Sequence, residues 1–166
     1  MKKLIFVRHG KAEDPDNALN DFGRSLTEKG KEISSQMARR LAKREKEQVT
    51  IVTSPAFRAL ETALIFAGTL KTGYDNIVIR EAIYGSFGLD SMCLILNELG
   101  DDHSAVVLFG HNPAFSLLVN HFSGINRGFM PKSGVACFEF DTGKWSAISR
   151  KNCRMTYFLH PDGTDE

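Results

Sequence analysis

The chain has 166 residues, of which 42% are hydrophobic and 25% are charged, which suits one soluble domain with a buried core. Its net charge of +1 provides no global field for nucleic acid, and no apolar run is long enough for a membrane span, so we expect neither partner. The 3 cysteines form no C-x-x-C pair, which excludes a zinc or dithiol motif and favours a reducing, cytoplasmic location. We therefore expect a single domain over residues 1–166.

The N-terminal part of the chain predicts a strand, a loop and a helix. Leu4–Val7 is apolar throughout, which predicts a buried strand of a parallel sheet. The polar stretch Lys11–Arg24 predicts a surface loop. Thr27 has the side chain of a helix N-cap, and apolar residues four apart behind it predict an amphipathic helix. We expect the charged residues Lys43–Lys46 to form the solvated end of that helix.

The rest of the chain alternates between predicted strands and helices. The expected strands are Thr50–Thr53, Ile77–Ile79 and Ala105–Phe109, and the expected helices are Ala56–Leu70, Ser91–Leu99 and Ala114–Phe122. This alternation predicts a three-layer α/β/α fold with a mainly parallel central sheet. Val135–Phe140 and Lys144–Ser149 flank an Asp-Thr-Gly turn and predict an antiparallel hairpin at the sheet edge, with Arg154–Leu159 as a further strand. The polar tail from Pro161 is expected to be frayed.

Charged and imidazole side chains follow the predicted strands where each strand ends. Arg8 and His9 follow the first strand, and Arg58 lies one helical turn beyond the second. Glu81 follows the third strand and His111 the fourth. Because ligands of open α/β sheets bind beyond the carboxyl ends of the strands, we expect these side chains to meet. Arginine offers a planar fork to phosphate oxygens, and a neutral imidazole can attack phosphorus. The cluster predicts an anion site, suited to a phosphoryl group, with a nucleophile or a base inside it.

Further residues extend the predicted site. Gly10 has no Cβ and would allow the backbone to approach a bound phosphate. Glu81 is the candidate general acid by its position, although a solvated carboxylate at a strand end is equally common. Asp21 and Arg24 are candidates for orienting the pocket, whereas Tyr84 near the mouth is expected to pack rather than to bind.

Three blocks of the sequence resemble the motifs of the histidine phosphatase superfamily, which includes the cofactor-dependent phosphoglycerate mutases. They are Arg8-His9-Gly10, Ser54–Ala63 and Gly110–Pro113, and they occur in the family order. The small size and the Gly-His-Asn-Pro form of the third block are most similar to SixA-type phosphohistidine phosphatases. The resemblance implies a phosphoglycerate mutase-like fold, with His9 as the nucleophile that forms a covalent phosphohistidine intermediate. It also implies a phosphate pocket of Arg8, Arg58 and His111, and neither a metal nor a cofactor.

The length of the connection after the third predicted strand indicates the kind of substrate. Phosphoglycerate mutases and sugar-bisphosphatases carry a longer covering insertion where this chain has only Ala82–Asp90, which implies an open site. An open site favours phosphohistidine on a protein, such as a histidine phosphotransfer domain, over an enclosed metabolite. Hydrolysis of a small phosphate ester by the same residues is the alternative. A non-catalytic phosphate-binding module is disfavoured because the predicted nucleophile His9 and all its expected partners are present.

Overall fold

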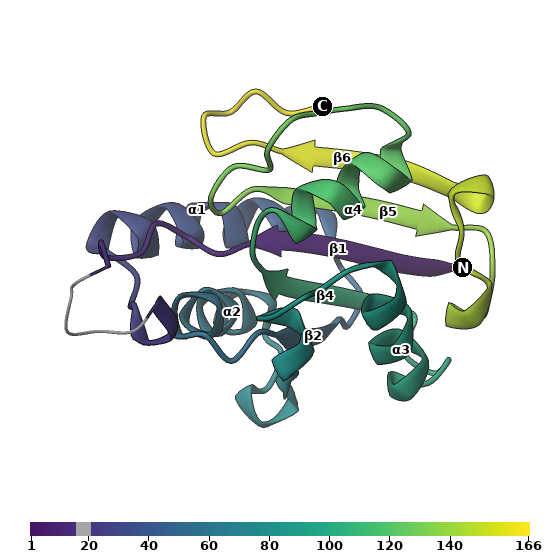
Figure 1. Cartoon of the computed structure of the whole chain (residues 1–166), viewed down its shortest axis with the longest axis horizontal. Helices are drawn as coiled ribbons and strands as arrows, with labels where there is room; N and C mark the ends of the chain where they lie inside the picture. Colours follow the sequence, from purple (N-terminus) through teal and green to yellow (C-terminus); the bar gives the residue numbers. More distant parts are fainter. Residues whose placement is uncertain (16–20) are drawn as a thin grey trace.

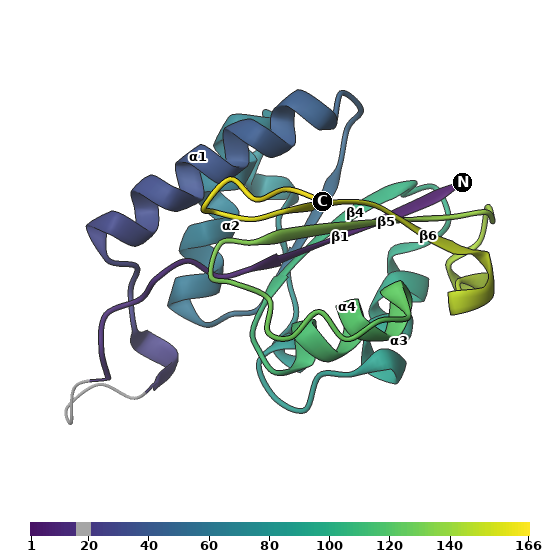
Figure 2. The same cartoon turned by 90° about the horizontal axis from the view of Figure 1, so that it is seen from above.

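The computed structural model describes residues 1–15 and 21–166, and in this part of the chain a six-stranded sheet lies between two layers of helices (Figure 1). The strands are β1 (Lys2–Arg8), β2 (Thr50–Thr53), β3 (Val78–Ile79), β4 (Ala105–Gly110), β5 (Val135–Phe140) and β6 (Cys153–Leu159). The α-helices are α1 (Glu28–Arg44), α2 (Phe57–Leu70), α3 (Leu89–Leu99) and α4 (Ala114–Ser123). Figure 2 shows α1 and α2 on one side of the sheet and α3 and α4 on the other. The predicted three-layer α/β/α fold is confirmed.

The sheet has the order β3-β2-β4-β1-β5-β6. The first four strands of that order run parallel, β5 is antiparallel to β1, and β6 is antiparallel to β5. The central strand β1 is covered on both faces: Leu4 and Phe6 pack toward α3 and α4, whereas Ile5 and Val7 pack toward α1 and α2. Burial on both faces explains why this strand is apolar throughout.

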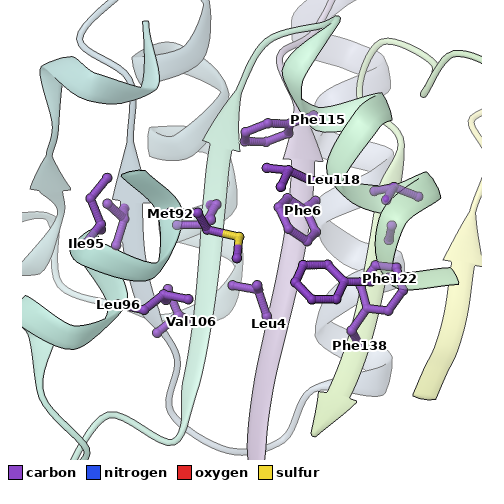
Figure 3. Packing of buried hydrophobic residues seen from close by; sticks show 14 of the residues in the cluster. Leu4, Phe6, Met92, Ile95, Leu96, Val106, Phe115, Leu118, Phe122 and Phe138 are labelled. Atoms are coloured by element: carbon purple, nitrogen blue, oxygen red, sulfur yellow. The ribbon is translucent and has the colours of Figure 1, made fainter. Parts of the chain in front are cut away.

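Aromatic side chains fill the core between the sheet and α4 (Figure 3). The ring of Phe6 meets Phe115 edge-on with centroids 5.3 Å apart, and Phe138 in the same way at 6.0 Å. A Cβ on Gly110 would lie 2.6 Å from the Phe115 ring, so only glycine lets α4 begin this close to the end of β4. His111 lies between the end of β4 and the start of α4.

The loop predicted over Lys11–Arg24 leads from β1 to α1, and its residues 16–20 lie outside the described part of the chain. Ala12 pairs with Leu26 in an isolated antiparallel bridge, and residues Asp21–Gly23 form a 3-10 turn. The Thr27 hydroxyl accepts a hydrogen bond from the amide of Gly30 at 3.0 Å, which confirms the predicted N-cap of α1.

The prediction of a strand over Lys144–Ser149 is wrong. Residues Trp145–Ala147 form a 3-10 helix instead, and β5 pairs with β6. The Trp145 indole is buried and donates to the carbonyl of His103 at 2.9 Å, while its backbone amide donates to Asp101 Oδ1 at 2.8 Å. This tryptophan therefore packs beside the end of α3 rather than extending the sheet.

The charge run Lys43–Lys46 is not uniformly solvated as predicted, because Glu45 is buried. Its carboxylate accepts hydrogen bonds from Lys3 Nζ at 2.8 Å and from the Tyr157 hydroxyl at 2.7 Å. A buried carboxylate needs such partners to offset its loss of hydration, and here they join α1 to β1 and β6.

The tail from Pro161 is also more ordered than predicted. Phe158 and Glu166 exchange backbone hydrogen bonds of 2.8 and 3.0 Å. Asp165 forms an ion pair with Arg40 of α1. The tail therefore folds back on β6 and α1, which sequence polarity alone does not reveal.

Candidate active site

His9 lies at the carboxyl end of β1 and is only 7% exposed. Its Nδ1 is 2.8 Å from the carbonyl oxygen of Gly10. Since a carbonyl can only accept, Nδ1 carries the proton and Nε2 keeps a free electron pair. Burial lowers the pKa of His9 to about 3, and the charges of His111, Arg58 and Arg8 act in the same direction. The imidazole is therefore neutral at neutral pH, as a nucleophile must be.

His111 follows β4, and its ring centroid is 5.1 Å from that of His9. Its Nε2 is 2.8 Å from the hydroxyl oxygen of Ser54, the residue after β2. Its Nδ1 is buried and has no hydrogen-bond partner among the described residues. Burial, followed by the charge of Arg58, lowers the pKa of His111 to about 4. The predicted convergence of the ends of β1, β2 and β4 is thus present.

Arg58 lies in the first turn of α2 and is 6% exposed. Its Nη1 and Nη2 donate to the backbone carbonyl and to the carboxylate of Asp21 at 2.5 and 2.7 Å. The carboxylate also accepts from Arg24 at 2.7 Å and from the Tyr84 hydroxyl at 3.1 Å. Burial tends to raise the pKa of Asp21, but the hydrogen bonds from Arg58 and Arg24 outweigh it and lower that pKa. Asp21 is therefore an ionised anchor for Arg58.

Arg8, the last residue of β1, is held by the loop before β5. Its Nη1 donates to the carbonyl of Met130 at 2.8 Å, and the Asn112 side chain donates to the same oxygen at 3.0 Å. The Nε of Arg8 is buried without a hydrogen-bond partner among the described residues. Burial lowers the pKa of Arg8. An anion that accepted from this guanidinium would replace the hydration it has lost.

Gly10 has a packing role in this structure. Its amide donates to the hydroxyl of Thr62 on α2 at 3.0 Å, so that donor is already used. A Cβ at this position would lie 2.6 Å from the Ser34 hydroxyl on α1. Glycine thus lets both helices approach the end of β1, and phosphate binding by Gly10 stays a prediction that these contacts do not support.

The end of β3 contributes differently from what its sequence suggested. Glu81 is exposed, and its carboxylate has no hydrogen bond or ion pair with a described residue, so its acid role stays a prediction. Arg80 forms an ion pair with Glu98, in which its Nε lies 3.6 Å from the carboxylate. Tyr84 is the residue that reaches the cluster, with its ring centroid 5.6 Å from that of His111.

Sequence reasoning missed three contributors to the site. The Ser54 hydroxyl forms a hydrogen bond with His111, and the Thr62 hydroxyl accepts one from the Gly10 amide. The carbonyl of Met130 accepts one from Arg8. Ser54 follows a strand, which is a usable signal, whereas Met130 acts through its backbone carbonyl and leaves no mark in the sequence pattern.

The described residues include no group of three or more His, Cys, Asp or Glu side chains that could hold a metal ion. Among the helices in the described part of the chain, none is both long and apolar enough to cross a membrane.

A buried neutral histidine flanked by arginines, at the carboxyl ends of parallel strands, is an arrangement that can bind and transfer a phosphoryl group. A model of the histidine phosphatase superfamily (branch 1) matches residues 4–86, which is half of the chain. The chain belongs to this superfamily and is a phosphatase. The matched segment contains Arg8, His9 and Arg58, while His111 lies beyond it.

One relative and two solved structures are similar to this chain. An uncharacterised protein of Picosynechococcus sp. is 34% identical over 111 residues, which are 67% of this chain and 67% of that protein. A crystal structure assigned as the phosphohistidine phosphatase SixA of Agrobacterium tumefaciens has a TM-score of 0.80 at 23% identity, covering 96% of this chain and 98% of that one. A mycobacterial glucosyl-3-phosphoglycerate phosphatase has a TM-score of 0.68 at 14% identity, covering 94% and 98%. At these identities, the two structures establish the fold, which is the predicted phosphoglycerate mutase-like one.

Proposed function

We propose that this phosphatase removes the phosphoryl group from phosphohistidine on a protein, through a covalent intermediate on His9. The observation that carries the proposal is the state of His9: its Nδ1 proton is held by the Gly10 carbonyl, and its pKa of about 3 keeps Nε2 unprotonated. A nucleophile in this state needs no separate base.

The chemistry follows from the contacts around His9. Its Nε2 forms a bond to phosphorus while the bond from phosphorus to the substrate imidazole breaks, and the substrate leaves as neutral imidazole when its other nitrogen is protonated. The phosphorylated ring of His9 then carries a positive charge, which the hydrogen bond from Nδ1 to the Gly10 carbonyl stabilises. Water attacks phosphorus, the bond to Nε2 breaks, and His9 returns to its neutral form with release of phosphate and a proton.

Charge on the transferring phosphoryl group needs donors around it. Arg58 uses two of its N–H groups on Asp21, which leaves others for phosphate. The Nε of Arg8 and the Nδ1 of His111 are both buried, and neither has a hydrogen-bond partner among the described residues. We propose these three side chains as the phosphate ligands.

The openness of the site supports a protein substrate. Only a short connection, residues 84–88, separates the 3-10 turn Glu81–Ile83 from α3. A site that no long insertion covers suits a phosphoryl group presented on another protein better than an enclosed metabolite. The three free cysteines support the proposed cytoplasmic location.

A small phosphate ester is the second candidate substrate, because one side of the mouth is aromatic. The ring of Phe22 lies 5.3 Å from that of Tyr84 and 6.3 Å from that of Phe57. Phe57 is half-exposed, so this wall could pack against the organic part of a small substrate.

Phosphate release by the wild type and by His9→Asn tests the proposal, with a phosphohistidine-bearing protein offered beside a panel of small phosphate esters. Asparagine keeps a donor for the Gly10 carbonyl but has no nucleophilic nitrogen. Faster, His9-dependent turnover of the phosphohistidine protein is the expected result. A preference for an ester would transfer the function to small metabolites, and substantial turnover by His9→Asn would refute the covalent mechanism.

A further inference from the structure

An apolar groove of about 610 Å³ runs along the outer side of α4. The loop that follows α4 forms its other wall, and Pro113, Leu117, Ile125 and Phe129 contribute apolar side chains. Leu117 is 65% exposed and Phe129 is 76% exposed, which is unusual for neighbouring large apolar residues. Because Leu117 and Phe129 are exposed, the groove opens to solvent.

The groove is built on the backbone that holds the catalytic cluster. The carbonyl of Met130, the residue after Phe129, accepts the hydrogen bonds from Arg8 and Asn112. Ser116, which lines the groove, donates to Asn112 at 2.8 Å and accepts from the Met130 amide at 2.8 Å. One wall of the groove is thus tied directly to a phosphate-binding arginine, and anything seated in the groove lies beside the site.

The one charged side chain among the described residues that line the groove is positive. Arg150 lines it near the C-terminal end of α4, where its Nη2 donates to the carbonyl of Gly124 at 3.3 Å. The first turn of α4 lies at the other end and adds the partial positive charge of a helix N-terminus. No carboxylate is among the described residues that line the groove. An occupant with acidic residues beside an apolar face would complement this surface.

We infer that this groove docks an amphipathic helix, with acidic residues flanking its apolar face, of the protein that carries the phosphohistidine. The inference rests on the proposed function and names the surface that selects the substrate. The 10 residues of α4 extend about 15 Å, which matches about three turns of a docked helix. A single phosphoryl group offers little area for selection, so specificity for a protein substrate needs contacts of this kind away from phosphorus.

The test compares two leucines of similar exposure on neighbouring helices. Leu117→Glu places a like charge in the groove toward an acidic partner, and Leu94→Glu places the same charge on α3, outside the groove, at a leucine that is 61% exposed. The probes are a small panel of histidine phosphotransfer domains phosphorylated on histidine, and free phosphohistidine.

For the panel member that the wild type hydrolyses fastest, we expect kcat/KM to fall about tenfold or more in Leu117→Glu. Leu94→Glu should match the wild type on every probe. Free phosphohistidine should be hydrolysed equally by all three proteins, which shows that the variants are folded and that the catalytic cluster works. Phe129→Ser should repeat the Leu117→Glu result by removing apolar area rather than adding charge.

Three results would overturn the inference while leaving the proposed chemistry in place. They are unchanged turnover of the protein probe by both groove variants, an equal loss in Leu94→Glu, or a wild type that prefers no panel member over free phosphohistidine. If no phosphohistidine probe, free or on a protein, is hydrolysed in a His9-dependent way, the proposed function itself fails, and that failure is distinct from a failure of docking.

Discussion

His9 should resist protonation far more strongly than an ordinary histidine. Burial lowers its pKa from 6.5 to about 3. At pH 5 a histidine with the ordinary pKa is about 97% protonated, whereas His9 should be about 99% neutral. The shift corresponds to about 5 kcal/mol against the charged form. The nucleophile should therefore remain competent in mild acid.

The same shift predicts how stability depends on pH. Because the folded-state pKa of His9 lies below that of the unfolded chain, the unfolded chain binds the extra proton between pH 3 and about 6.5. The stability associated with neutral His9 is thus complete above about pH 6.5 and is lost as the pH falls toward 3. Between pH 7 and pH 5 the loss should be about 2 kcal/mol.

Two assays measure this effect. Nuclear magnetic resonance of the ring protons gives the pKa directly, and urea unfolding of the wild type and His9→Asn at pH 7 and pH 5 gives the linkage. The wild type should lose about 2 kcal/mol more than the variant on acidification, since asparagine does not titrate. An NMR pKa near 6.5, or identical acid losses in the two proteins, would refute the reasoning.

Four further predictions follow from other contacts. Arg58→Ala should lower kcat/KM about a hundredfold or more, since a donor to the phosphoryl charge is lost, and a near-normal rate would remove Arg58 from the site. Gly30→Ala should unfold at lower temperature and lose about 3 kcal/mol or more, because the added Cβ would lie 2.1 Å from the carbonyl oxygen of Lys11; an unchanged melting temperature would contradict this packing. Glu45→Ala should lose about 2 kcal/mol in urea unfolding with turnover unchanged, because the Tyr157 hydroxyl loses its acceptor and Lys3 keeps only the carboxylate of Glu139 at 3.7 Å; the idea fails if activity falls instead. Glu81→Gln should slow an ester with a poor leaving group while sparing phosphohistidine, and equal rates on both substrates would argue against an acid role.

Much of the fold could be predicted because its signals are local. The apolar run Leu4–Val7 is buried on both faces, and Thr50–Thr53 has the predicted bounds of β2. The prediction of a strand over Lys144–Ser149 was wrong because Trp145 packs beside α3 instead of adding to the sheet. Burial of Glu45 depends on Lys3 and Tyr157, which are remote in sequence, so no local rule could have shown it.

The site could be predicted in part for a similar reason. His9, Arg58 and His111 each follow a parallel strand, and topology alone brings such positions together. The anchoring of Arg58 by Asp21 and of Arg8 by Met130 joins segments separated by 37 and 122 residues. Those contacts arise from how loops fold over the sheet edge, which residue types at strand ends do not encode.

The most direct test of the account is detection of a phosphoryl group on His9. The wild type would be mixed with phosphohistidine-bearing protein and quenched in alkaline denaturant, which preserves the acid-labile N–P bond, and the peptides would be analysed by mass spectrometry. The account predicts a phosphorylated peptide that contains His9 in the wild type and none in His9→Asn, which should also lack turnover. Steady turnover by the wild type without this species, together with activity in His9→Asn, would contradict it.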